Sequence, residues 1–126
     1  MPNGNILLVD DEFMWRELFA MALAADGHTV ASASSGAEAL ALLEQRPFDV
    51  VLLDLLMPGM SGLEVLQQAR ARALASSPEF IVLSGSENPE SKAACRELGV
   101  TRFLPKPIDR GTLSSQLEEA LRQRAE

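Results

Sequence analysis

The sequence is poor in cysteine, with Cys95 as the single one among 126 residues. A lone cysteine excludes a disulfide framework within the chain and fits a reducing compartment. His28 is also the single histidine, so Cys95 has little choice of a base to activate it. We therefore expect Cys95 to be a small helix residue and not a nucleophile.

Long apolar runs are also missing. No stretch approaches the roughly 20 apolar residues that a membrane-spanning helix needs. The N-terminal stretch MPNGNILLVDDE has no basic region ahead of its apolar residues and is too acidic for a signal peptide. These absences predict a cytoplasmic protein with no membrane partner.

Basic residues are in the minority, with 11 lysines and arginines against 18 acidic residues and a net charge of −7. This balance disfavours nucleic acid as a direct ligand, but it leaves cations and basic proteins as partners. Apolar residues make up 47% of the chain and charged residues 23%. These proportions and the length predict one globular domain over residues 1–126 with a real core.

Short apolar runs alternate with segments of helical character along the chain. Strands are expected at 6–9, 28–33, 50–53, 80–83 and 101–105. Helices are expected at about 12–25, 35–47, 61–73 and 88–99, and from residue 109 onward. This order is typical of an α/β fold with a parallel sheet covered by helices on both faces. The weakly alternating run at 28–33 and Pro105 at the end of the last run indicate edge strands.

The helix faces and helix starts are predicted from spacing. The first helix carries one apolar face, and the last helix points a similar set inward: Met14, Leu18, Met21, Ala22 and Ala25 in the first, and Leu113, Leu117, Ala120 and Leu121 in the last. Four later helices have capping signals at their starts: Ser35 with Glu38, Ser61 with Glu64, Asn88 with Pro89, and Asp109.

Polar residues follow the apolar runs where each strand ends. The first strand is followed by Asp10, Asp11 and Glu12, the third by Asp54, the fourth by Ser84 and the last by Lys106. The carboxyl ends of parallel strands meet at one edge of the sheet, where open α/β folds bind their ligands. The sequence therefore predicts a site at this edge.

The predicted site combines groups that suit phosphoryl transfer. Clustered carboxylates repel one another and favour a hard cation such as Mg²⁺. Lys106 adds a positive charge and Ser84 a hydroxyl, and aspartate is a known covalent acceptor of phosphate. Each residue alone has a plainer interpretation: Asp54 as a turn residue, Asp10 and Asp11 as helix caps, Ser84 as loop composition and Lys106 as a solvated lysine. The coincidence of complementary groups at four strand ends favours one joint site.

Four stretches of the sequence resemble the CheY-like receiver domains of bacterial two-component response regulators. They are ILLVDDE, DVVLLDLLMPGMSGLEVL, IVLSG and FLPKPI, and their order and spacing also agree, so that the match covers nearly the whole chain. The resemblance implies a flavodoxin-like, doubly wound, five-stranded parallel sheet of order 2-1-3-4-5 with five helices. The family often has a cis bond before the proline at the position of Pro107.

The resemblance also implies the role of each site residue. Asp54 would accept a phosphoryl group from a phosphohistidine on a sensor histidine kinase or a phosphotransfer protein. Mg²⁺ would be bound by Asp11 directly, by Asp10 mostly through water, by Asp54, and by the backbone carbonyl of Leu56. Ser84 and Lys106 would hold the phosphoryl oxygens.

The same resemblance implies a switch. Ser84 would move toward the phosphoryl group and Phe103 would follow, which rearranges the surface of the fourth helix, fifth strand and fifth helix. Ordinary core packing is an equal alternative for Phe103.

Leu56 departs from the polar residue that many relatives have at this position, and an apolar side chain there predicts slow self-dephosphorylation.

The expected protein is thus a signalling module and not an enzyme, apart from accepting and slowly losing its own phosphoryl group. Its downstream partner is either another protein or an effector domain of a larger regulator, and it is a monomer or a phosphorylation-dependent homodimer. Two alternatives remain open at this point. One is a Mg²⁺-dependent aspartyl-phosphate phosphatase of the haloacid dehalogenase kind, and the other is a receiver-fold binding module that works without phosphorylation.

Overall fold

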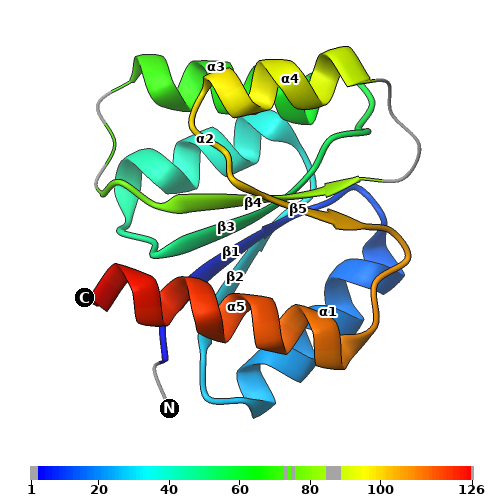
Figure 1. Ribbon diagram of the computed structural model, residues 1–126, viewed down its shortest axis with the longest axis vertical. Coiled ribbons are helices and arrows are strands. Elements are labelled where there is room, and N and C mark those ends of the chain that lie inside the picture. The colour runs from blue at the N-terminus through cyan, green and yellow to red at the C-terminus, as the bar shows by residue number, and fades with distance from the viewer. Residues whose placement is uncertain (1–2, 73, 75, 85–88, 126) are drawn as a thin grey trace.

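The computed structural model describes residues 3–72, 74, 76–84 and 89–125, with only the backbone of Ser84 and Ala125. Five strands and five helices alternate along these residues (Figure 1). In chain order they are β1 (Asn5–Val9), α1 (Phe13–Ala25), β2 (Thr29–Ala33), α2 (Gly36–Gln45), β3 (Val50–Asp54), α3 (Gly62–Ala71), β4 (Glu79–Ser84), α4 (Pro89–Glu97), β5 (Arg102–Pro105) and α5 (Arg110–Ala125).

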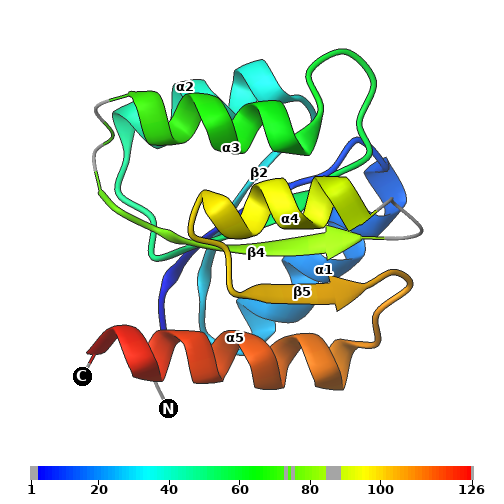
Figure 2. The same ribbon diagram turned by 45° about the horizontal axis from the view of Figure 1, so that its top comes forward.

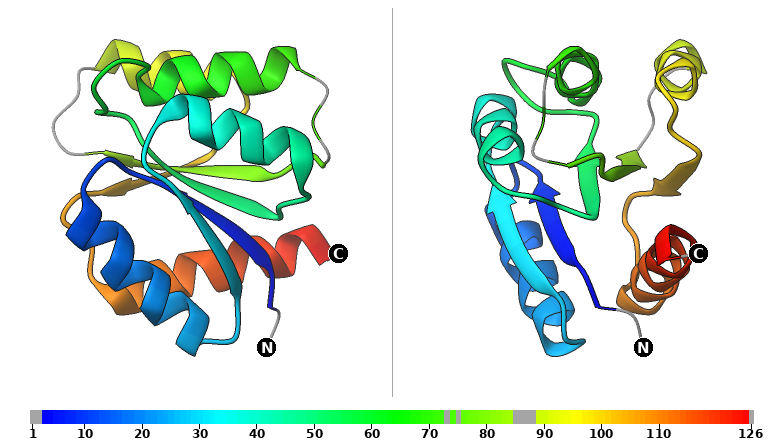
Figure 3. Two further views of the ribbon diagram at one scale, coloured as in Figure 1. Left: turned by 180° about the vertical axis from the view of Figure 1, so that it is seen from behind. Right: turned by 90° about the vertical axis from the view of Figure 1, so that its left-hand side faces the viewer.

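The five strands form one parallel sheet in the order β2-β1-β3-β4-β5, which confirms the predicted topology. Helices α1 and α5 cover one face, and α2, α3 and α4 cover the other (Figures 1 and 2). The view along the sheet in Figure 3 shows the resulting three layers. The predicted edge strands are confirmed as β2 and β5, and Pro105 is the last residue of β5.

The central strands are buried on both faces, as their continuous apolar sequences predict. Their side chains alternate between two core clusters because the period of a strand is two residues. In β3, Val50 and Leu52 join the cluster under α1 and α5, while Val51 and Leu53 join the cluster under α2, α3 and α4. This alternation also fixes the side of the sheet on which the last residue of each strand lies.

The helix starts agree with most of the predicted caps. Ser61 and Glu64 form a complete capping box, and the Asp109 carboxylate accepts the amide of Thr112 at 2.8 Å. Ser35 accepts the amide of Glu38 as predicted, but the Glu38 carboxylate accepts from the backbone N–H of Ser34 instead of Ser35. Helix α4 begins at Pro89 as predicted, and the proposed cap Asn88 lies outside the described residues.

The predicted inward face of α5 is confirmed, whereas the apolar face predicted for α1 does not pack against the core. Met14, Leu18 and Met21 are 78%, 64% and 72% exposed, whereas Phe19 and Leu23 are buried on the opposite side. Helix α1 is apolar around most of its circumference, so spacing alone offers two possible stripes. The larger aromatic side chains decide between them, because burying Phe19 together with the half-buried Trp15 removes more apolar surface from water.

Two further features bear on earlier expectations. Cys95 is a buried residue of α4, as expected for a structural cysteine. The bond between Lys106 and Pro107 is cis, as the family resemblance implies. Among the described residues, no helix has the length and apolar character to span a bilayer.

Candidate functional site

Strand register brings Asp10 and Asp54 together at the carboxyl edge of the sheet. Val9 pairs with Leu53 across β1 and β3, so the residues that follow in each strand are neighbours. Both acids continue the alternation that places Ile6 and Leu8 of β1 and the matching residues of β3 under α1 and α5. They are the two buried charged residues of the described part, 0% and 3% exposed. Their side chains therefore share one small volume that excludes most water.

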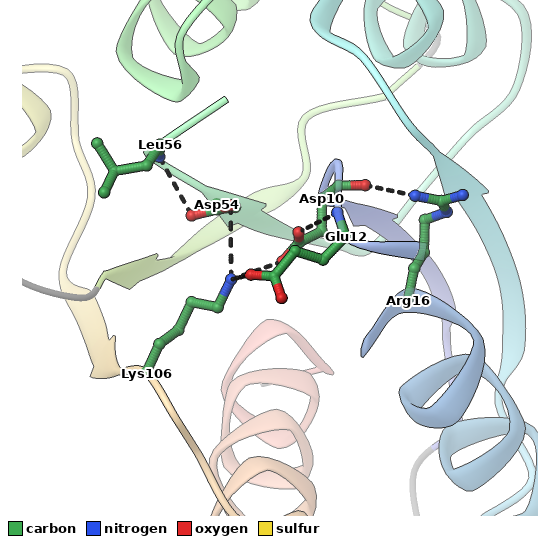
Figure 4. Close-up of polar contacts among 6 residues, drawn as sticks. All are labelled: Asp10, Glu12, Arg16, Asp54, Leu56 and Lys106. Carbon is green, nitrogen blue, oxygen red and sulfur yellow. Dashed lines mark hydrogen bonds and ion pairs between the residues drawn. The ribbon is translucent and has the colours of Figure 1, made fainter. Parts of the chain in front are cut away.

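Lys106 supplies the positive charge in this volume (Figure 4). Its Nζ lies 2.9 Å from Asp10 Oδ2, 3.3 Å from Glu12 Oε1 and 3.5 Å from Asp54 Oδ2. The lysine follows directly after β5, whose register with β4 carries the chain to the same edge. Three carboxylates thus share one ammonium group, which leaves the site with an excess of negative charge.

A third aspartate completes an acidic cluster. One ligand oxygen from each of Asp10, Asp11 and Asp54 lies within 4.8 Å of the others, and the Asp11 side chain is exposed to solvent. Hard divalent cations prefer such carboxylate oxygens, and Mg²⁺ keeps several waters when one side of its site is open. The donor set therefore fits Mg²⁺.

The charge imbalance is visible in the acid–base properties of the site. Burial, reinforced by the negative charge of Asp10, raises the pKa of Asp54 from its ordinary value near 3.8 to about 6. Burial alone would lower the pKa of Lys106, but its hydrogen bond to Asp10 and the charges of Asp10 and Asp54 outweigh this and raise it. These shifts favour the charged form of Lys106 and disfavour the charged form of Asp54. A bound cation would offset the unfavourable energy of the Asp54 charge.

Backbone groups hold both acids in place. The N–H of Leu56 donates to Asp54 Oδ1 at 3.1 Å, and the N–H of Glu12 donates to Asp10 Oδ1 at 2.9 Å. Arg16 Nη1 donates to the backbone oxygen of Asp10 at 2.7 Å (Figure 4). The Leu56 side chain itself is 61% exposed and extends away from the other residues drawn in Figure 4.

Glycine is required at position 62, where α3 begins beside the end of β3. A Cβ at Gly62 would overlap the backbone oxygen of Asp54 and come within 2.7 Å of the Cα of Leu55. The N–H of Gly62 donates to the oxygen of Leu55 at 3.1 Å. The α3 helix can therefore approach the end of β3 closely only because residue 62 has no side chain.

Of the two predicted switch residues, the structure describes the side chain of Phe103 but only the backbone of Ser84. Phe103 is half-buried against the core cluster under α2, α3 and α4, and the guanidinium of Arg96 lies 5.0 Å from its ring centroid. Ser84 ends β4, and its backbone lies beside Pro105 of β5 at the edge of the sheet that carries the acids. Its hydroxyl lies outside the described part of the structure.

Four residues at the site were given no such role from the sequence: Glu12, Trp15, Arg16 and Gly62. The sequence analysis treats Glu12 only as one of three acids after the first strand. Arg16 lies one helical turn after Glu12, a spacing at which a side chain reaches back toward the preceding loop. For Gly62, its place just after the Ser61 cap is the available signal, but a close approach between helix and strand is a tertiary property.

Comparisons with known proteins decide the family. The model of the family described as the response regulator receiver domain matches residues 6–118. The chain belongs to the response regulator receiver domain family. Receiver domains are generally signalling modules and not enzymes, and they interact with histidine kinases and effector domains.

Solved structures agree with this assignment. The chain superposes on a CheY-like receiver domain protein from Methanospirillum hungatei JF-1 with a TM-score of 0.89 and 26% identity, covering 96% of this chain and 95% of that one. Against chemotaxis protein CheY4 of Vibrio cholerae the TM-score is 0.85 at 31% identity, covering 93% and 98%. The receiver fold is thus shared along nearly the whole of each chain.

Curated relatives are longer proteins. The transcriptional regulatory protein GlrR of Escherichia coli (strain K12) is 33% identical over 97% of this chain but only 27% of its own length. The transcriptional regulatory protein YkoG of Bacillus subtilis (strain 168) is 32% identical over 98% of this chain and 53% of its own length. The chain therefore spans between about a quarter and a half of these relatives.

Proposed function

We propose that this receiver domain is switched by phosphorylation of Asp54. The observation that carries the proposal is the position of the Asp54 carboxylate: it is buried at the end of β3, 3.5 Å from Lys106 and within 4.8 Å of the ligand oxygens of Asp10 and Asp11. A carboxylate that adjoins both a lysine ammonium and an acidic cluster suited to a cation fits a transferring phosphoryl group, whose charge is spread over three oxygens.

The donor is a phosphohistidine on a sensor histidine kinase or a phosphotransfer protein. An Asp54 carboxylate oxygen forms the new bond to phosphorus as the bond from phosphorus to the donor nitrogen breaks. The imidazole keeps the electron pair of that bond and takes up a proton from solvent. Burial and the charge of Asp10 already disfavour the Asp54 charge. Transfer replaces this single charge by the two charges of the phosphoryl group, so the site needs the cations that balance it.

Mg²⁺ is the cofactor that fits this site, held by Asp10, Asp11, Asp54 and the backbone carbonyl of Leu56. When bound, it neutralises charge on the carboxylates and on the phosphoryl oxygens. Lys106 orients a phosphoryl oxygen from the opposite flank, and the Ser84 hydroxyl donates to another. Arg16 and the amide of Glu12 hold Asp10 against movement while these charges change.

The phosphorylated state is read out at β5 and its neighbouring helices. Phe103 lies between the core cluster and Arg96 of α4, so a shift of its ring changes the surface formed by α4, β5 and α5. That surface contacts a downstream protein, an effector domain of a longer regulator, or a second copy of the chain. Comparing pull-downs and elution volumes with and without beryllofluoride and Mg²⁺ distinguishes these partners.

The direct test is intact-mass spectrometry after incubation with acetyl phosphate and Mg²⁺. The wild type is expected to gain one phosphoryl group, and Asp54→Asn none. Chelation of the metal is expected to suppress the adduct in the wild type. An adduct that persists in Asp54→Asn, or a wild-type protein that gains none, overturns the proposal. Steady turnover of p-nitrophenyl phosphate would instead favour a phosphatase.

A further inference from the structure

The ring of Trp15 lies beside the site lysine. Lys106 Nζ is 5.2 Å from the centroid of the indole. The ring packs in turn on Phe19, with 4.6 Å between the two centroids, and Phe19 is buried in the cluster under α1 and α5. The indole is therefore fixed from behind by the core, and it offers the ammonium a rigid surface within the range of a cation–π contact.

An indole at this position lowers the stability of the fold compared with a purely apolar side chain of similar size. Trp15 Nε1 is the one buried side-chain polar atom without a hydrogen-bond partner among the described residues. A buried donor that lacks a partner destabilises the folded state, and phenylalanine or leucine would fill much of the same space without it. What indole adds over those side chains is the most electron-rich ring face available to a protein.

The two acidic partners of Lys106 do not by themselves fix its position. The lysine side chain is a flexible four-carbon stem with a point charge. Its shortest contact is to Asp10, a member of the acidic cluster, and a divalent cation in that cluster competes for the same carboxylate. Its second partner, Glu12, has a side chain that is 66% exposed, and a pair of this kind contributes little. The attraction of a ring face does not depend on the charge state of either acid.

We propose that Trp15 is a positioning residue for Lys106. Its ring face holds the ammonium beside Asp54 when a metal competes with Lys106 for the Asp10 carboxylate, so that Lys106 meets the incoming phosphoryl group already in place. This inference rests on the proposed function, because it assigns Trp15 a part in phosphorylation of the same aspartate.

Fluorinated tryptophan tests the electronic part of this proposal without changing the packing. Trp15 is the single tryptophan of the chain, so biosynthetic incorporation modifies one position. Successive fluorines withdraw electron density from the ring and leave its shape nearly unchanged. From unmodified to trifluorinated indole, we expect the rate of phosphorylation by acetyl phosphate at saturating Mg²⁺ to fall stepwise, by about threefold or more in total. The affinity for Mg²⁺ and the free energy of unfolding in urea are expected to stay constant.

Nuclear magnetic resonance tests the contact independently of phosphorylation. Lys92 and Lys106 are the two lysines, and Lys92 on α4 is the internal control. With ¹³C-labelled lysine, the ε-methylene protons of Lys106 are expected to be shifted upfield by the indole ring current, relative to Lys92. The shift is expected to persist when Mg²⁺ is added and to disappear in Trp15→Leu.

Different failures have different meanings. A rate that is equal across the fluorinated series, at unchanged stability, overturns the positioning role. So does a Lys106 signal that moves to the position of Lys92 when Mg²⁺ is added. If the unmodified protein gains no phosphoryl group at all, the proposed function fails, and the resonance of Lys106 in Mg²⁺ still decides whether Trp15 holds it.

Discussion

Leu52 and Asp54 lie two residues apart on β3, on the same side of the sheet, and both are almost completely buried at 0% and 3% exposure. Burial acts on them in opposite directions. It stabilises the fold through the apolar surface of Leu52, whereas it disfavours the charged form of Asp54 and raises the pKa of that group to about 6. Burial of Leu52 in the body of the strand thus stabilises the fold, whereas burial of the charged Asp54 carboxylate at its carboxyl end destabilises it.

The largest expected effect comes from the stable half of this comparison. Leu52→Ala removes a fully buried side chain and should lower the free energy of unfolding by about 3–5 kcal/mol, as measured in urea. Leu56→Ala is the matched control four residues along the chain, at a side chain that is 61% exposed. Its expected loss is below about 1 kcal/mol. Equal losses at both positions would contradict the described burial.

The next effect concerns the contact between the end of β3 and α3. Gly62→Ala places a methyl group against the backbone of Asp54 and Leu55, and should lower the free energy of unfolding by about 1–3 kcal/mol. It should also displace Asp54, so the rate of phosphorylation falls together with stability. Gly111→Ala in the first turn of α5 is the control, since its new Cβ comes no closer than 3.3 Å to Asp109. A variant at Gly62 as stable as the control would refute the close approach.

Removing the charge at Asp54 is expected to raise stability. At pH 7.5 without metal, the free energy of unfolding of Asp54→Asn should be about 1–2 kcal/mol higher than that of the wild type. The folded state holds a proton on Asp54 up to about pH 6, above its ordinary pKa near 3.8. Stability of the wild type should therefore fall as pH rises through this interval, and this component should be missing in the variant.

Mg²⁺ supplies the control for that prediction. Binding to the folded state alone stabilises it by mass action, and Asp54→Asn lacks one ligand. Added Mg²⁺ should thus raise the free energy of unfolding more in the wild type than in the variant. The stability advantage of Asp54→Asn over the wild type should therefore become smaller. A variant that is less stable than the wild type in metal-free buffer would show that burial does not oppose the Asp54 charge.

The smallest effect concerns the lifetime of the phosphorylated state. Leu56 offers its amide to Asp54, but its aliphatic side chain cannot orient a water molecule toward phosphorus. Leu56→Asn should shorten the half-life of phosphorylated Asp54 several-fold, about 1 kcal/mol in the barrier, and Leu56→Ala should leave it nearly unchanged. Loss of the phosphoryl adduct followed by mass spectrometry gives both rates. A half-life that shortened with alanine but not with asparagine would contradict this account.

Much of this comparison was predictable from the sequence because it depends on strand ends. Apolar runs that stop at Asp10, Asp54 and Lys106 predict both the parallel sheet and the edge at which their side chains meet. Strand register makes neighbours of Asp10 and Asp54, but β5 is separated from β1 by β3 and β4. The ion pair of Asp10 with Lys106 therefore also depends on the path of the chain after β5 and on the long lysine side chain.

Helix α1 was less predictable, for a physical reason. Its sequence is apolar on two sides, and the stripe with Met14 and Leu18 has the same period as the stripe with Trp15 and Phe19. The choice depends on how aromatic rings pack under α1 and α5, which is a tertiary property. The contact between Trp15 and Lys106 follows from that choice and so was not predictable either.

Lys106 joins Asp10 across 96 positions of the chain, and it follows the last strand of the sheet. During synthesis, therefore, the acidic cluster leaves the ribosome long before the ammonium that balances it. A nascent chain that stops before β5 carries Asp54 but lacks this counter-charge. If Asp54 is phosphorylated as proposed, we expect the capacity for phosphorylation to be among the last properties that this domain acquires during synthesis.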